Sequence, residues 1–172
     1  MRARAWSWVC FLTLVLSVAV AACESTPEAK FVNVHPGQMP EGQAWAGVYY
    51  NPVYGHLHMV EQEGNVSGRW KRTDGSHWGE MSGTVTGNVL HFTWREHKVS
   101  GIGPSAESHG SGVFVYKLGE SDIPELEGQY AIEGSASIGD WHCVKQLNTK
   151  PDPNSINGDN PGEPPATQDK WK

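Results

Sequence analysis

The sequence predicts an all-β fold, with a single small antiparallel up-and-down barrel of about eight strands between two flexible segments. Three observations support this fold class. Apolar and polar residues alternate from residue 44 to residue 147, turn residues interrupt the alternation at short intervals, and helical periodicity is almost absent. A segment of this length can bury one core, which indicates one domain. A flattened β-sandwich is the alternative architecture.

The alternating segments are predicted strands, each with one face toward the core. They cover residues 44–50, 55–62, 65–72, 79–86, 88–96, 111–118, 126–133 and 140–147. Turn signals such as Gly64-Asn65, Asp74-Gly75 and Gly87-Asn88 separate several of them. Because connections this short favour pairing between consecutive strands, the order of strands in the sheet should follow the chain.

The chain begins with the features of a secretory signal peptide. Arg2 and Arg4 precede an apolar run that ends in small residues at Ala22. A transmembrane helix would need roughly 20 apolar residues and a stop-transfer flank, and the polar ESTPEAK that follows is not such a flank. We therefore expect residues 1–22 to be removed during export.

The end of this segment, Val20-Ala21-Ala22-Cys23, resembles the lipobox of bacterial lipoproteins. The resemblance implies cleavage between Ala22 and Cys23, attachment of diacylglycerol to the Cys23 thiol, and acylation of the new N-terminus by a fatty acid such as palmitate. Several acyl chains anchor a protein stably. Glu24 stands where an aspartate would retain the protein at the inner membrane, so the resemblance also implies the outer membrane. An ordinary cleavage site with a coincidental cysteine is the alternative.

Composition divides the rest of the chain into three parts. Residues 23–43 are polar and contain proline, as expected of a flexible tether. Residues 44–147 form the predicted barrel domain. Residues 148–172 are rich in Pro, Asn, Gly and Asp, so they cannot offset their ordering entropy by burial and are predicted to be a disordered tail. An ordered extended arm on the barrel is the alternative for this segment.

The charge of the mature chain argues against a nucleic-acid partner. Without Arg2 and Arg4, 11 of the 13 basic residues remain against 19 acidic ones, a net charge of −8 with no basic patch. Cys10 would leave with the signal peptide and Cys23 would carry lipid, so Cys143 has no partner for an intramolecular disulfide. Its strand-like surroundings, GDWHCVKQL, predict a buried thiol that behaves as a small apolar side chain.

Four short motifs resemble the avidin-like barrels: Gly-Val-Tyr-Tyr-Asn at 47–51, Tyr-Gly-His at 54–56, Ser-Gly-Arg-Trp at 67–70 and His-Phe-Thr-Trp-Arg-Glu at 91–96. The resemblance, like that to lipocalin-type barrels in general, implies a central pocket. Its candidate ligand-binding residues are Tyr49, Asn51, Trp70 and Trp94. The motifs depart from the family at His56, where a serine hydroxyl belongs, and at Trp70, where a tyrosine belongs. Biotin is therefore not the expected ligand, because unpaired polar groups in a buried pocket are costly.

Metal binding and catalysis have weak support in the sequence. His56 and His58 lie two residues apart, so both imidazoles would project from one face of a strand, but the neighbouring Leu57 and Met59 are apolar and should take the inner face. We expect solvated surface histidines, no metal site and no cofactor. Nucleophile, phosphate-loop and zinc-protease motifs are missing from the sequence.

The longest predicted irregular connection, residues 97–112, is rich in glycine and serine. A nucleophile–base pair from Ser105, Ser108 and His109 is conceivable there, but a flexible lid or a partner-contact loop fits such a segment better. We therefore predict no enzymatic activity.

Together these features predict a lipid-anchored protein of the outer membrane, on its periplasmic face or at the cell surface. Its expected role is that of a non-enzymatic accessory or structural subunit of an envelope complex, which docks a protein partner through the barrel wall or through residues 97–112. Two alternatives stay open: a small-ligand-binding barrel, and an inhibitor of a hydrolase that attacks the envelope.

Overall fold

The structure is a computed structural model that describes residues 31, 33–100, 102–103 and 106–158. The predicted signal peptide, Cys23 and the first part of the predicted tether, residues 23–30, lie outside these residues, as does residue 32. So do residues 159–172 of the predicted tail and Ser105.

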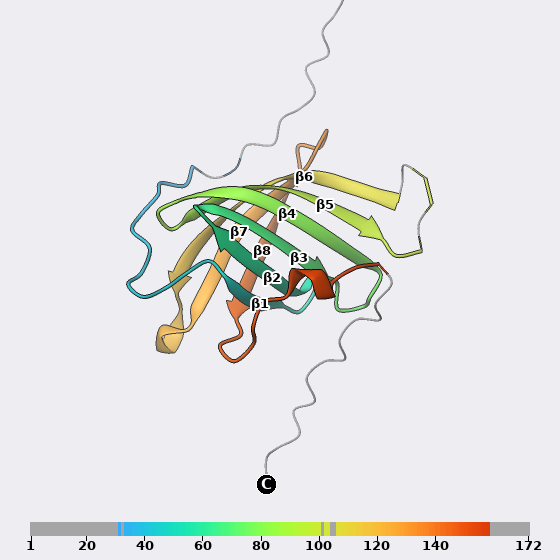
Figure 1. The fold of residues 1–172 in the computed structure, drawn as a ribbon. Helices are drawn as coiled ribbons and strands as arrows, with labels where there is room; N and C mark the ends of the chain where they lie inside the picture. The colour runs from blue at the N-terminus through green and yellow to red at the C-terminus, as the bar shows by residue number, and fades with distance from the viewer. Residues whose placement is uncertain (1–30, 32, 101, 104–105, 159–172) are drawn as a thin grey trace, which may run out of the picture.

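Eight antiparallel strands close into a barrel in chain order, which confirms the predicted fold class (Figure 1). The strands are β1 (Gly47–Asn51), β2 (Gly55–Gln62), β3 (Asn65–Lys71), β4 (His77–Thr86), β5 (Val89–Lys98), β6 (Glu107–Leu118), β7 (Pro124–Ile132) and β8 (Ile138–Lys145). Among the elements of the described residues are two short 3-10 helices, η2 (Glu120–Asp122) before β7 and η3 (Pro153–Ser155) after β8.

The seam between the first and last strands is the shortest pairing in the barrel. β4 and β5 match residue by residue from His77 opposite Lys98 to Thr86 opposite Val89. At the seam, β1 and β8 match only through Tyr49 opposite Lys145 and Tyr50 opposite Val144. One further backbone bond, 2.7 Å from the Gln146 N–H to the Val48 carbonyl, extends this contact.

The predicted irregular connection at 97–112 is about half as long in the structure, because residues 97–98 and 107–112 belong to strands. His97 and Lys98 belong to β5, and β6 already begins at Glu107. Glycines make this possible. Gly110 and Gly112 face inward on β6, and a Cβ on Gly112 would lie 2.3 Å from the ring of Phe92. The expectation of a long loop was therefore wrong, and its glycines serve close packing inside the barrel.

The inward side chains form one buried aromatic and aliphatic cluster, as the alternation predicts. On β5, Leu90, Phe92 and Trp94 point into it together. Trp141 lies at its centre, with ring centroids 4.8 Å from Tyr54, 5.0 Å from Trp70 and 5.3 Å from Phe114. Cys143 is buried in the same cluster.

Residues 146–158, here called the C-terminal arm, lie against the outside of the barrel. The arm leaves β8, passes β1 and reaches β2 and β3, where η3 packs (Figure 1). The Asp152 N–H donates to Nδ1 of His58 at 3.0 Å, and Ile156 is only 8% exposed. The predicted disordered tail starts at residue 148, whereas residues 148–158 are ordered on the wall. This buried isoleucine and the pairing with His58 supply the contacts that composition did not reveal.

Candidate functional site

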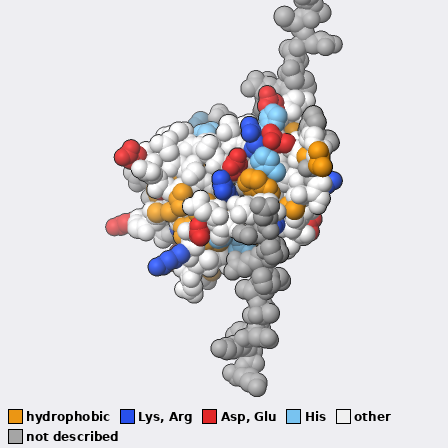
Figure 2. All heavy atoms as spheres, turned by 45° about the vertical axis from the view of Figure 1, so that its right-hand side comes forward, with side chains coloured by type: hydrophobic (Ala, Val, Ile, Leu, Met, Phe, Trp, Pro, Cys, Tyr) orange, Lys and Arg blue, Asp and Glu red, His pale blue; other side chains and the backbone are white. Residues whose placement is uncertain are grey.

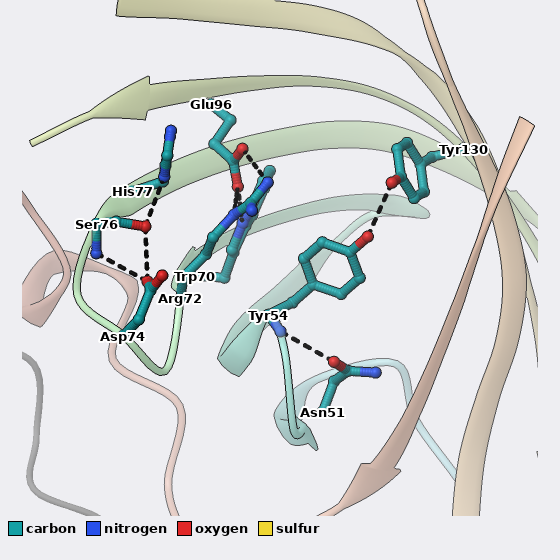
Figure 3. Close-up of polar contacts among 9 residues, drawn as sticks. All are labelled: Asn51, Tyr54, Trp70, Arg72, Asp74, Ser76, His77, Glu96 and Tyr130. Atoms are coloured by element: carbon teal, nitrogen blue, oxygen red, sulfur yellow. Dashed lines mark hydrogen bonds and ion pairs between the residues drawn. The ribbon is translucent and has the colours of Figure 1, made fainter. Parts of the chain in front are cut away.

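A buried carboxylate closes one mouth of the barrel (Figure 3). Glu96 of β5 is 7% exposed. Its Oε1 accepts hydrogen bonds from Trp70 Nε1 at 3.2 Å and from Arg72 Nε at 2.8 Å, while Oε2 accepts from Arg72 Nη2 at 2.6 Å. The hydrogen bond to Glu96 is the main reason why the pKa of Arg72 is raised. Because the Arg72 guanidinium engages both carboxylate oxygens, the Glu96 side chain is fixed in place.

Two tyrosines complete the same mouth. Tyr54 and Tyr130 share a hydrogen bond of 2.8 Å between their hydroxyls, and the Arg72 guanidinium lies 5.6 Å from the ring centroid of Tyr54. Burial, followed by the bond to Tyr130, raises the pKa of Tyr54 far above its ordinary value. The Tyr54 phenol therefore stays neutral at physiological pH.

The turn between β3 and β4 brings a serine and a histidine together at the edge of this mouth. Ser76 Oγ lies 2.7 Å from His77 Nδ1, and Asp74 Oδ1 accepts from both the Ser76 hydroxyl at 2.6 Å and its N–H at 2.9 Å. These bonds lower the pKa of Asp74. In a catalytic triad the carboxylate orients the imidazole. Here Asp74 holds the serine instead, so the contact stabilises a turn.

The four predicted ligand-binding residues do not line one cavity. Trp70 and Trp94 belong to the same aromatic cluster, since Trp70 packs on Trp141 and Trp94 packs on Tyr130 at 5.8 Å. The Tyr49 hydroxyl donates to the Trp45 carbonyl at 2.9 Å, and burial raises its pKa strongly. Each of these side chains is buried by its neighbours within the protein.

Asn51 is engaged by the chain itself. Its Oδ1 accepts from the backbone N–H groups of Val53 at 2.7 Å and Tyr54 at 2.9 Å, and its Nδ2 donates to the His142 carbonyl at 2.6 Å (Figure 3 shows the Tyr54 contact). Both ends of the side-chain amide are thus committed to the β1–β2 turn and to the neighbouring β8. A ligand would have to break these bonds to use the amide.

The outer wall of β2–β6, by contrast, is hollowed. A depression of about 800 Å³, here called the outer groove, lies across these strands. Its floor is a row of small side chains on neighbouring strands: Ser67 stands opposite Ser82, and Ser82 opposite Thr93. Because these side chains are short, the sheet face lies open between taller neighbours.

Charged and polar side chains rim the outer groove, and Figure 2 shows acidic, basic and histidine side chains interspersed on this part of the surface. The rim comprises Val60, Arg69, Glu80, Arg95, His109, Glu133, Pro153 and Asn154. Arg69 pairs with Glu80 at 3.5 Å, and His109 Nε2 lies 2.7 Å from Glu133 Oε2. Pro153 and Asn154 come from the C-terminal arm, so the arm forms one bank of the groove.

The histidines and serines singled out in the sequence are dispersed. His56 packs against the ring of Tyr50 at 4.9 Å, but His58 is 7% exposed beneath the arm, so the expectation of a solvated side chain was wrong there. Ser108 and His109 are consecutive in β6 and therefore point to opposite faces. Among the residues that the structure describes, no group of three His, Cys, Asp or Glu side chains could hold a metal ion.

These features define the class of protein as a small closed β-barrel with a packed interior and a grooved outer wall. Within the described ranges, no helix is long and apolar enough to cross a membrane. Compared with protein-family models, with curated proteins and with solved structures, the chain matches none. The resemblances to the lipobox and to the avidin-like barrels therefore stay predictions, and function has to be argued from the geometry.

Proposed function

We propose that this protein is a lipid-anchored, non-enzymatic accessory subunit of an envelope complex, which docks a protein partner through its outer groove. One observation carries the proposal: among the described residues a hollow of about 800 Å³ lies on the outer wall, while the barrel interior is filled by aromatic side chains. His109 and Gly110, from the segment first expected to dock a partner as a loop, line this groove as part of β6.

The groove suits side-chain recognition. Its strands are all paired with neighbours, so a partner cannot add a strand to a free edge and must bind side chains instead. The hydroxyl groups on the floor can donate and accept hydrogen bonds, and the rim carries charged side chains of both signs. Such a surface is similar to the polar rim of a protein–protein interface. Inhibition of an envelope-targeting hydrolase would be one form of this docking role.

The test fills the groove and leaves the barrel intact. Thr93→Arg places a long side chain on the floor, and we expect at least a tenfold loss of partner crosslinking from a photoreactive residue at position 82 in the native host. Gln129→Arg is the matched control, because Gln129 lies outside the groove on β7 and the charge change is the same. Equal crosslinking by both variants would contradict docking at this site.

The anchor is tested separately. If Cys23 carries lipid, Cys23→Ser should abolish labelling by radioactive palmitate and release the protein from the membrane fraction. Retention of label on the variant would contradict lipidation at Cys23. That result would not affect the proposal that a partner docks in the outer groove.

A small-ligand-binding barrel is the second candidate. The observation that favours it is the Trp141 Nε1 donor, which is buried in the centre of the barrel and has no hydrogen-bond acceptor among the described residues. Native and denaturing mass spectrometry of the exported protein tests it: a discrete mass that is lost on denaturation would support a carrier, and identical masses would favour the docking role.

A further inference from the structure

One side of β8 is only partly covered by its neighbour. β8 runs from Ile138 to Lys145, but β1 is matched with it only at Val144 and Lys145. β1 itself ends at Asn51. Residues 138–142 therefore extend past the end of β1, beside the turn that connects β1 to β2.

The sequence explains why the pairing with β1 stops there. Tyr50 stands opposite Val144 in the register of the two strands. Two residues further along, Pro52 would stand opposite His142, but proline has no N–H to donate and its φ is fixed. The Asn51 side-chain amide donates to the His142 carbonyl at 2.6 Å and so takes the place of the missing N–H.

The turn between β1 and β2 is bonded to the β3–β4 turn and not to β8. The Pro52 carbonyl accepts from the Thr73 hydroxyl at 2.8 Å, and the Val53 carbonyl accepts from the Thr73 N–H at 3.3 Å. Val53 itself is 59% exposed. The turn therefore does not continue the sheet along the first half of β8.

The backbone groups that this leaves unpaired follow from the strand geometry. Alternate residues of an antiparallel strand direct their N–H and C=O groups to opposite neighbours. The bond from the Gln146 N–H to the Val48 carbonyl, 2.7 Å long, shows that the even-numbered residues at this end of the chain face β1. Both backbone groups of Ile138 and Asp140, and the N–H of His142, therefore have no hydrogen-bond partner among the described residues. We call these three residues the free edge of β8.

An exposed anion stands in the middle of the free edge. The Asp140 carboxylate has one polar contact with the described residues, a long bond of 3.4 Å from Gln129 Nε2. The nearby Glu127, by contrast, pairs with Lys117 at 2.9 Å. The chain as a whole carries a net charge of −6. A strand that adds to this edge is therefore favoured if it places a cationic side chain opposite Asp140.

We propose that the free edge of β8 binds an extended segment of a protein partner by strand addition, with a lysine or arginine of that segment opposite Asp140. In this mode main-chain hydrogen bonds supply affinity and alternate side chains supply specificity. A second copy of the chain fits less well, because antiparallel pairing of two copies over residues 138–142 brings the two Asp140 carboxylates together. The free edge lies outside the outer groove, so this proposal does not rest on the proposed function.

The test uses the exported protein and two synthetic peptides with blocked ends, Thr-Val-Lys-Val-Thr and Thr-Val-Glu-Val-Thr. Titration followed by amide NMR shifts gives the Kd of each peptide, and the lysine peptide should bind more tightly. At about ten times this Kd, hydrogen exchange of the Asp140 amide should slow about tenfold. The Trp141 amide faces β7, so its exchange should change little.

Charge reversal at the edge should reverse the preference. Asp140→Lys should weaken the lysine peptide about fivefold and strengthen the glutamate peptide by a similar factor. Glu120→Lys is the matched control, because it makes the same charge change at an exposed residue of η2, at the opposite end of the barrel. It should keep the preference for the lysine peptide.

The backbone contribution is tested separately with Ile138→Pro. This variant removes one N–H of the free edge at the first residue of a strand, where proline is tolerated. It keeps Asp140, so binding of both peptides should weaken while the preference for lysine persists. Unchanged binding would contradict strand addition.

Three further results would overturn the proposal. The first is the lack of any saturable shift of the free-edge amides with either peptide at millimolar concentration. The second is an equal response of Asp140→Lys and Glu120→Lys. The third is protection of the free-edge amides in the protein alone, which would mean that another part of the chain or, if it depends on protein concentration, a second copy occupies the edge. If circular dichroism shows that Asp140→Lys does not fold, the unmodified protein decides, and equal Kd values for the two peptides reject the proposal.

Discussion

The two faces of β3, β4 and β5 differ sharply in what they carry. Inward, these strands present Trp70, Met81 and Phe92 to the buried aromatic and aliphatic cluster. Outward, the same strands carry Ser67, Ser82 and Thr93, whose short side chains leave a hollow of about 800 Å³. The docking role proposed above depends on this outer face. The predictions that follow test this contrast, from the largest expected effect on stability to the smallest.

Removal of the central ring should be the most damaging change. Trp141→Ala deletes the side chain on which Tyr54, Trp70 and Phe114 pack, and large-to-small changes of this kind cost about 3–5 kcal/mol. Urea unfolding followed by circular dichroism measures the loss. Ser82→Ala, on the outer face, should change stability by less than about 0.5 kcal/mol. Similar costs for the two variants would contradict the contrast between a packed interior and an open wall.

Breaking the ion pair at the mouth should cost about 3 kcal/mol, because Arg72→Met leaves the buried Glu96 carboxylate without its partner. The double variant Arg72→Met with Glu96→Gln removes the uncompensated charge and should recover most of this loss. Urea midpoints of the single and double variants give the comparison. A double variant no more stable than Arg72→Met alone would show that Glu96 does not need Arg72.

The Cys143 thiol should be inert in the folded protein. Burial raises the pKa of the Cys143 thiol to about 12, whereas the pKa of a cysteine in an unfolded chain is about 8.5. At about pH 8 iodoacetamide should therefore modify Cys143 only after unfolding, as read from the mass of the peptide that contains it. Rapid modification of the folded chain would mean that the core opens.

The same pKa difference determines how the free energy of unfolding changes with pH. Above about pH 8.5 the unfolded chain releases the Cys143 proton while the folded chain retains it, so unfolding is favoured as pH rises. Stability from this group is fully present below that pH and declines above it. Cys143→Val should flatten the alkaline decline by a small but measurable amount, which urea midpoints between about pH 7 and about pH 10 would detect.

Alternation along the chain made most of the fold predictable. It placed Leu90, Phe92 and Trp94 on one face of a strand, and the structure finds all three in the core. Glu96 continues the same phase, and a carboxylate in phase with core residues signals a buried charge that needs a partner. The identity of that partner was not visible, because Arg72 lies beyond the end of β3 and comes near Glu96 only through the strand register, in which Trp70, Gly79 and Glu96 stand in one row.

The candidate site was less predictable, because it depends on which segments cover the wall. Alternation correctly predicts an outward His58, but its burial depends on Asp152, which is 94 residues away in the sequence. The composition of the arm predicts too little apolar burial for an ordered structure. The structure instead packs the arm on the barrel as far as residue 158, and Ile156 is buried there. The outer groove has no sequence motif either, since Ser67, Ser82 and Thr93 become neighbours only through strand register.

The short seam between β1 and β8 has a mechanical consequence. Under mechanical load, we expect the barrel to open first where two strands share the fewest hydrogen bonds. That place is the β1–β8 pairing, where Tyr49 stands opposite Lys145 and Tyr50 opposite Val144. The C-terminal arm follows β8 and bonds to His58 on β2, so it links the strands on the two sides of β1. If the chain is pulled from its N-terminus, the force reaches β1 before the other strands. The contact between the arm and β2 would then hold the barrel closed together with the β1–β8 pairing.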